Sequence, residues 1–210
     1  MYRFRRFLGL VLVVSGLALA LAGCSGSGGS GDGDDGQSDG GATTTTKTYT
    51  NDEYGFSITV DTQFSQGEPA AQASAGGEAV FSIVFADQDG PIASDRYVNA
   101  VQISVYEIGR AVEPEEVPQL AQEVQGIVDQ LMSAYPSAKV VEPLQEAEIN
   151  GVPGFGFKYT YEEGGTQITA VSFFLFRGQN EYQITAQATS EDWESVKGKM
   201  DAAAGSFTVQ

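Results

Sequence analysis

Hydrophobic and polar residues alternate along much of the chain after residue 49, a pattern that is typical of β-strands with one buried face. The first such segment is 54–60, in which Phe56, Ile58 and Val60 share one side. Acidic residues, glycine and asparagine separate several of the later segments, as expected for turns. Further strands are predicted at 79–86, 98–108, 155–161, 167–176 and 182–189.

In the middle of the chain the hydrophobic period changes from that of a strand to that of a helix. Glu113 and Pro114 open this helix, because proline suits a first turn and the helix dipole favours acids there. Pro136 ends the pattern, so the sequence predicts one continuous helix of about 20 residues. Its apolar positions, spaced three and four apart, are Val117, Leu120, Val124, Ile127, Val128, Leu131 and Tyr135.

A second helix is predicted near the C-terminus. Ser190 is a good N-cap, and Trp193, Val196 and Met200 would share the buried side. Strands joined by short turns, such as Arg177–Asn180, imply an antiparallel sheet whose apolar faces the two helices cover. We therefore expect an α+β fold, with an antiparallel β-sheet of about six or seven strands flanked by helices.

Four aromatic residues, Phe155, Phe157, Tyr159 and Tyr161, recur at every second position and therefore line one face of a strand. Such a ladder would suit stacking against a sugar or a peptide. It would equally suit a sheet core beneath an amphipathic helix, with the two tyrosine hydroxyls reaching the rim of that core. We favour the core, because the predicted helix needs an apolar surface to cover.

The N-terminal residues have the pattern of a lipoprotein signal peptide. Arg3, Arg5 and Arg6 precede an apolar stretch that is too short for a good membrane span. The stretch ends Leu-Ala-Gly23-Cys24, which predicts cleavage between these last two residues and lipid, such as diacylglycerol and palmitate, on Cys24. An ordinary signal peptide or an uncleaved anchor is the alternative. Cys24 is the single cysteine of the chain and stands where the lipoprotein pattern requires it.

Composition divides the chain into three parts. Residues 1–23 form the predicted signal peptide, and 24–48 form a lipidated cysteine with a flexible linker rich in glycine, serine, aspartate and threonine. Residues 49–210 form the α+β domain. We therefore expect a lipid-anchored protein at the cell membrane, with its domain on the extracytoplasmic side.

The predicted mature chain is strongly acidic. Removing the signal peptide takes away three arginines and no acids, which leaves 28 acidic and 8 basic residues, a net charge of −20. The basic surface that nucleic-acid binding requires is missing, so DNA and RNA are excluded as partners. The acids are scattered along the sequence, which is typical of a solvated surface.

Much catalytic chemistry is excluded because the sequence has no histidine. Catalysis by Ser-His-Asp or Cys-His is impossible, and a zinc site in the domain would have only carboxylate ligands. Paired carboxylates remain open as hydrolase groups. Glu162 with Glu163, and Asp87 with Asp89, are candidate pairs, but both lie in predicted turns and are read as solvated residues. We assign no catalytic, cofactor-binding or metal-ligating residue.

Four segments, found in a fixed order around the mid-chain helix, carry a family resemblance. They are Tyr54–Ile58, Asn150–Gly154, Glu181–Ala186 and Ser206–Phe207. The sequence resembles the PsbP-like family, which includes the DcrB and LpqN-type lipoproteins, over about residues 49–209. The resemblance implies an antiparallel sheet flanked by helices that serves as a binding or assembly module at membranes. It assigns no role to any single residue.

These observations favour a membrane-tethered bacterial lipoprotein whose domain is a non-catalytic binding or accessory module. Its partners would be the membrane, through the lipid anchor, and an envelope protein or small ligand that the sequence does not identify. Two alternatives are a carboxylate-based hydrolase of cell-envelope polymers and a structural spacer of the envelope. No cofactor is expected.

Overall fold

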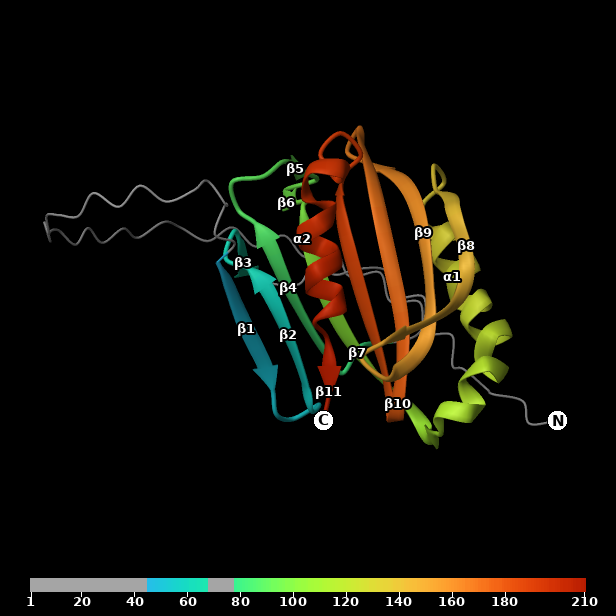
Figure 1. The fold of residues 1–210 in the computed structure, drawn as a ribbon. Coiled ribbons are helices and arrows are strands. Elements are labelled where there is room, and N and C mark those ends of the chain that lie inside the picture. Colours follow the sequence, from blue (N-terminus) through green and yellow to red (C-terminus); the bar gives the residue numbers. More distant parts are fainter. Residues whose placement is uncertain (1–44, 68–77) are drawn as a thin grey trace, which may run out of the picture. The chain divides into compact units, whose positions relative to one another are not determined.

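An antiparallel β-sheet forms the centre of the structure (Figure 1). The structure, a computed structural model, describes residues 45–67 and 78–210, all within one compact unit, Ala42–Gln210. Among these residues, six strands form the sheet in the order β3-β4-β7-β10-β9-β8. Their bounds are β3 (Phe64–Gly67), β4 (Phe81–Asp87), β7 (Ala100–Val112), β8 (Lys139–Ile149), β9 (Val152–Glu163) and β10 (Thr166–Thr189).

The long strand β10 folds back on itself at the predicted turn Arg177–Asn180. Ser172 and Thr185 are 13 positions apart, yet their hydroxyl oxygens are 2.9 Å apart in a hydrogen bond. The left-handed backbone of Gly178 (φ 60°) lies between them. Residues 166–175, the first arm, pair with β9, and residues 180–187 of the second arm pair with β7. If the two arms of β10 are counted separately, the six labelled strands provide seven extended segments. The antiparallel sheet with its helices confirms the predicted α+β fold.

A smaller sheet and one helix pack on one face of the central sheet (Figure 1). The smaller sheet contains β1 (Thr46–Asn51), β2 (Phe56–Asp61) and β11 (Thr208–Val209). The helix is α2 (Trp193–Gly205). Phe56, Ile58 and Val60 are fully buried, so the predicted one-sided strand is confirmed. β1 begins within the segment that the sequence assigned to the linker, because its threonines pair with β2.

The helix on the opposite face differs from its prediction at its start. The chain first forms a 3₁₀ helix, η1 (Pro114–Leu120), and only then the α-helix α1 (Ala121–Ala134). Pro118 lies inside η1 and has no N–H to donate, which disfavours an α-helical hydrogen bond there. Val117, Val124, Ile127 and Val128 are buried as predicted.

The second helix begins later than predicted. Asp192, and not Ser190, is the N-cap residue of α2. The Ser190 hydroxyl is instead 2.8 Å from the hydroxyl of Thr169, and its backbone N–H donates to the carbonyl of Gln167. Ser190 therefore ties the end of the second arm of β10 to the first arm.

A two-stranded hairpin stands apart from both larger sheets. It consists of β5 (Ile92–Ala93) and β6 (Arg96–Tyr97), in a segment for which the sequence predicted no element. Within the described ranges, no helix is long and apolar enough to cross a membrane.

Candidate binding pocket

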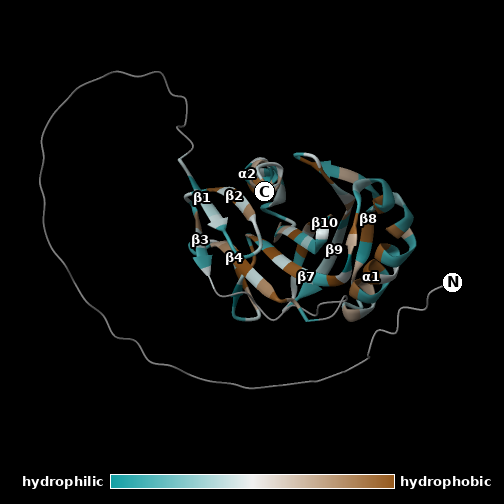
Figure 2. Ribbon diagram, turned by 90° about the horizontal axis from the view of Figure 1, so that it is seen from below, coloured by the Kyte–Doolittle hydropathy of each residue, from teal (hydrophilic) through white to brown (hydrophobic). Residues whose placement is uncertain are grey.

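We call the face of the central sheet on which η1 and α1 pack the α1 face, and it has two halves of opposite character. Hydrophobic and polar residues alternate along β4 and β7, as the colours in Figure 2 show. On β9 and the first arm of β10, this face is apolar and packs against the helices. On the second arm, β7 and β4, the same face carries amides and hydroxyls. Ser172 marks the boundary, because it stands opposite Phe157 in the ladder and bonds to Thr185.

The apolar half contains the predicted aromatic ladder. Phe155, Phe157, Tyr159 and Tyr161 are each 2–5% exposed. The Phe157 and Tyr159 rings stack with their centroids 4.8 Å apart. The ring of Tyr135, at the end of α1, has its centroid 4.5 Å from that of Tyr161. The interpretation of the ladder as sheet core is therefore confirmed.

The two ladder tyrosines direct their hydroxyls to the polar half. The Tyr161 hydroxyl donates to Oε1 of Gln187 at 3.1 Å. Burial raises the pKa of Tyr159 to about 12, which a hydrogen bond with Ser172 partly offsets. Burial also raises the pKa of Tyr161, with Tyr159 adding to the effect. Both hydroxyls therefore stay protonated at neutral pH and reach the rim of the core, as predicted.

The polar half is a row of buried or half-buried side chains that form hydrogen bonds across neighbouring strands. Ser82 on β4 and Ser104 on β7 have hydroxyl oxygens 2.9 Å apart, and the Gln102 amide donates to Ser104 at 3.1 Å. In the sheet register, Gln102 stands opposite Thr185. Such polar groups are unusual on the central strands of a sheet, where apolar side chains are the rule, so their position is informative.

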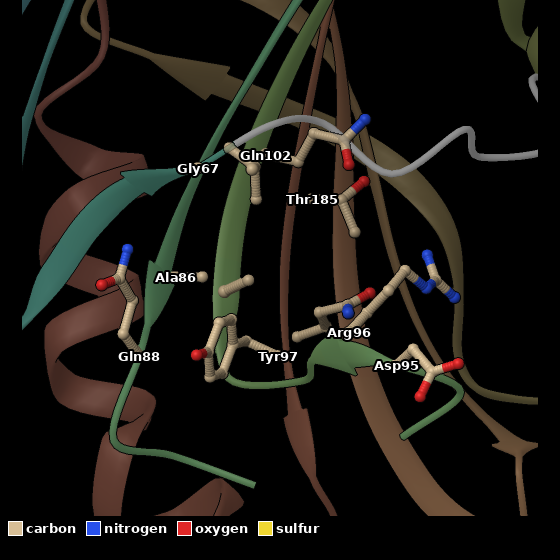
Figure 3. A pocket seen from close by; sticks show the side chains of 11 residues that line it. Gly67, Ala86, Gln88, Asp95, Arg96, Tyr97, Gln102 and Thr185 are labelled. Atoms are coloured by element: carbon tan, nitrogen blue, oxygen red, sulfur yellow. The ribbon is translucent and has the colours of Figure 1, made fainter. Parts of the chain in front are cut away.

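A pocket of about 250 Å³ lies at one end of this row (Figure 3). Figure 3 shows Gln102 and Thr185 on the sheet strands, with Asp95, Arg96 and Tyr97 on the side of the β5–β6 hairpin. We call it the polar pocket. Its lining residues are Gly67, Val84, Ala86, Gln88, Asp95, Arg96, Tyr97, Ala100, Gln102, Thr185 and Gln187.

The β5–β6 hairpin beside the pocket has a strained turn. Ser94 and Asp95 have left-handed backbones, with φ of 48° and 63°, and each such residue costs about 1–3 kcal/mol. An ion pair between Arg96 and Glu163 connects the hairpin to the end of β9, with side chains 33% and 19% exposed. This contact helps to fix the turn that places Tyr97 at the pocket.

The acids that the sequence placed in turns have separate environments. Asp87 is only 7% exposed, so its reading as a solvated residue is wrong. Its carboxylate accepts a hydrogen bond from the Gln63 amide and one at 3.2 Å from the N–H of Asp89, which compensates for its burial. Glu163 pairs with Arg96, whereas Glu162 is exposed. Neither predicted acid pair lines the polar pocket.

A second, shallower groove lies between η1 and β8. Its lining includes two carboxylates, Glu146 and Glu148, together with Pro114, Pro118 and Pro153. Both glutamates are exposed to solvent. In the part of the chain that the structure describes, no group of three or more acids, cysteines or histidines could hold a metal ion.

Gly23 and Cys24, the predicted cleavage and lipidation residues, lie outside the described residues. The pocket residues were not predicted from the sequence. The available signal was the alternation of Gln183, Thr185 and Gln187 with apolar residues, which shows that this strand has a polar face.

Comparison with known proteins identifies the family. The model of the PsbP family matches residues 44–209. The chain belongs to the PsbP family. The family predicted from the sequence is therefore confirmed. No curated protein matches the sequence significantly.

Two solved structures share the fold. Cyanobacterial PsbP (CyanoP) from Synechocystis sp. PCC 6803 superposes with a TM-score of 0.53 at 14% identity, over 83% of this chain and 98% of CyanoP. LpqN of Mycobacterium tuberculosis, described as involved in cell envelope biogenesis, superposes with a TM-score of 0.51 at 11% identity, over 81% of this chain and 87% of LpqN. At these identities, the similarity shows the fold alone.

Proposed function

We propose that this PsbP-family protein is a lipid-anchored, non-catalytic binding protein of the cell envelope, and that the polar pocket is its ligand site. One observation carries the proposal. The central strands β7 and β10, where a small domain needs apolar packing, present Gln102, Thr185 and Gln187 at a pocket of about 250 Å³. A few convergent polar groups in a formed pocket are typical of a binding site.

The chemistry of the pocket supports binding more than catalysis. Asp95 is the single carboxylate among its lining residues, and the nearby Glu163 is held by Arg96. General acid–base hydrolysis of a glycosidic bond requires two carboxyl groups facing the same bond. The pocket supplies hydrogen bonds to a ligand without such a pair.

The anchor rests on the sequence around Cys24. The involvement of LpqN, which shares this fold, in cell envelope biogenesis supports a location in the cell envelope.

Metabolic labelling with radioactive palmitate tests the anchor. We expect the wild-type protein and a Ser25→Ala control to incorporate label and fractionate with membranes, whereas Cys24→Ala incorporates none. A Cys24→Ala protein that still carries label would refute the lipidation site.

Site-specific photocrosslinking in intact cells tests the ligand site. A photoreactive phenylalanine analogue replaces Tyr97, which is 40% exposed at the pocket, or Val141, which is 51% exposed on β8. We expect the probe at position 97 to capture a reproducible molecule, identified by mass spectrometry, that the probe at 141 does not capture. Identical captures at both positions, or none at position 97, would contradict the proposed site.

A hydrolase remains the second candidate because of the groove that contains Glu146 and Glu148. These residues are two positions apart on one strand, so their backbone positions are about 7 Å apart, and carboxyl groups at a similar separation would suit an inverting glycosidase. Both side chains are exposed to solvent, whereas the acid of a glycosidase lies in a site that shelters the scissile bond, so the groove fits this chemistry poorly. Release of reducing ends from purified wall polymers by wild type, but not by Glu146→Gln with Glu148→Gln, would favour this alternative.

A further inference from the structure

We propose that the polar pocket selects an organic cation, namely an ammonium or guanidinium group at the end of a small molecule or of a peptide side chain. This inference rests on the proposed binding function and specifies the chemistry of its ligand. It follows from the charges at the pocket, from the hydrogen-bonding groups left open there, and from one aromatic ring.

The formal charges at the pocket favour a cation. Arg96 and Asp95 are the charged residues that line it. The guanidinium of Arg96 is already paired with Glu163, so that pair is neutral as a whole. Asp95 has no ion-pair partner among residues 45–67 and 78–210. Asp95 is exposed to solvent, and its carboxylate gives the lining of the pocket one negative charge that no ion pair within the described residues offsets.

The pocket also presents a hydrogen-bond acceptor that a cation can use. The Gln102 amide nitrogen donates to Ser104 at 3.1 Å, and the Gln187 amide nitrogen donates to the carbonyl of Val98 at 3.2 Å. The Gln102 carbonyl oxygen accepts no hydrogen bond from the described residues, whereas the Gln187 carbonyl oxygen already accepts one from the Tyr161 hydroxyl. Ammonium and guanidinium groups have donors only, so they match acceptors such as the Gln102 oxygen and the Asp95 carboxylate.

An aromatic ring completes the site. Tyr97 is 40% exposed and lines the pocket from the hairpin side. A cation over the face of such a ring is attracted by its quadrupole. The volume of about 250 Å³ lies below the roughly 300–1,000 Å³ that drug-sized ligands need, so the pocket suits one small head group.

The electrostatic field of the whole chain also favours a cationic ligand. The predicted mature protein has 28 acids against 8 bases. Such an excess attracts cations and slows the approach of anions. Selectivity for cations should therefore weaken as salt is raised, because exposed charges are screened.

The test uses the mature lipoprotein in detergent micelles, labelled with ¹⁵N, and follows the backbone amide signals of Asp95, Tyr97 and Gln102. N-acetyl-arginine amide and spermidine are the cationic probes, myo-inositol is the neutral probe and N-acetyl-glutamate is the anionic probe. We expect saturable shifts with both cations and none with the other two. Tighter binding of the tripeptide Gly-Arg-Gly than of spermidine would indicate that the natural ligand is a peptide side chain. Tighter binding of spermidine would indicate that it is a free amine.

Variants separate the contributions. Asp95→Asn should weaken cation binding at least about tenfold, as expected for the loss of a charge-assisted hydrogen bond. Asparagine tolerates the left-handed backbone at this position, so the turn should persist. Asp129→Asn on α1 removes the same charge away from the pocket and should leave binding unchanged. Tyr97→Leu should weaken binding about two- to fivefold, whereas Tyr97→Phe retains the ring and should stay within about twofold of wild type.

Two results would overturn the cation proposal. These are stronger shifts at the same amides with myo-inositol or N-acetyl-glutamate, and cation binding that Asp95→Asn leaves unchanged. In both cases, a specific photocrosslink from position 97 would leave the binding function intact and remove only its cation selectivity. Absence of both a probe response and a crosslink would refute the binding function as well.

Discussion

The two halves of the α1 face use the same sheet for different purposes. In the apolar half, Phe157 stacks between Tyr159 at 4.8 Å and Phe174 at 5.9 Å, beneath α1. In the polar half, Gln102, Ser104 and Thr185 occupy equivalent inward positions but pair through hydrogen bonds. Apolar burial stabilises a domain directly, whereas buried hydrogen bonds contribute little net stability but fix geometry. The comparison indicates that the apolar half holds the fold and the polar half holds the site.

The largest expected effect is on the apolar half. Phe157 is 2% exposed, so Phe157→Ala should lower the free energy of unfolding by about 3–5 kcal/mol, through lost burial and a cavity. Chemical denaturation of the purified protein measures this loss. Val141→Ala, at an exposed position of β8, should change stability by less than about 0.5 kcal/mol. A loss of under about 1 kcal/mol for Phe157→Ala would show that the ladder is not the main source of stability.

Alkaline pH should also act through the apolar half. In the folded state, burial raises the pKa of Tyr159 from 10.0 to about 12. The contribution of the Tyr159 hydroxyl to the free energy of unfolding is intact below pH 10. It is lost as pH rises through about 12, because the hydroxyl loses its proton at a lower pH in the unfolded chain than in the folded protein. The loss should reach about 2–3 kcal/mol. Denaturation at pH 8–12 should show a shallower decline for Tyr159→Phe than for wild type, and equal slopes would contradict the assignment.

At the boundary between the halves, removing one partner should cost more than removing both. Ser172→Ala leaves the buried hydroxyl of Thr185 without this hydrogen bond and should cost about 1–3 kcal/mol. Adding Thr185→Val removes the orphaned hydroxyl, so the double variant should be no less stable than Ser172→Ala alone. Denaturation of both single variants and the double variant measures the coupling. Strict additivity would mean that the two hydroxyls are not coupled.

The smallest effect on global stability is expected beside the pocket. Glu163→Gln removes the charge that pairs with Arg96, and a partly exposed pair contributes only about 0–1 kcal/mol. The strained hairpin should nevertheless open more often, which hydrogen exchange of residues 92–97 would detect. Glu162→Gln, the exposed neighbour, is the matched control. Unchanged exchange in Glu163→Gln would show that the ion pair does not hold the hairpin.

Much of the fold was predictable because strong periodicity survives in the sequence. The strand at Phe56–Val60, the ladder from Phe155 to Tyr161 and the apolar side of α1 all have a single buried face, which leaves a clear pattern. β8 was not predicted, because this edge strand is exposed at most of its positions. The hairpin of β5 and β6 was also missed, because its turn contains Ser94 and Asp95 where the usual signal is Asn-Gly.

The sequence by itself determined the order of the main strands, the buried side of the helices, the absence of histidine chemistry and the family resemblance. It also predicts the lipid anchor at Cys24. The tertiary structure alone decided where the polar pocket lies. Its lining runs from Gly67 to Gln187, and only the pairing of β3, β4, β7 and β10 brings these positions together. Local sequence fixes which face a side chain occupies, but strand order and register decide which side chains meet there.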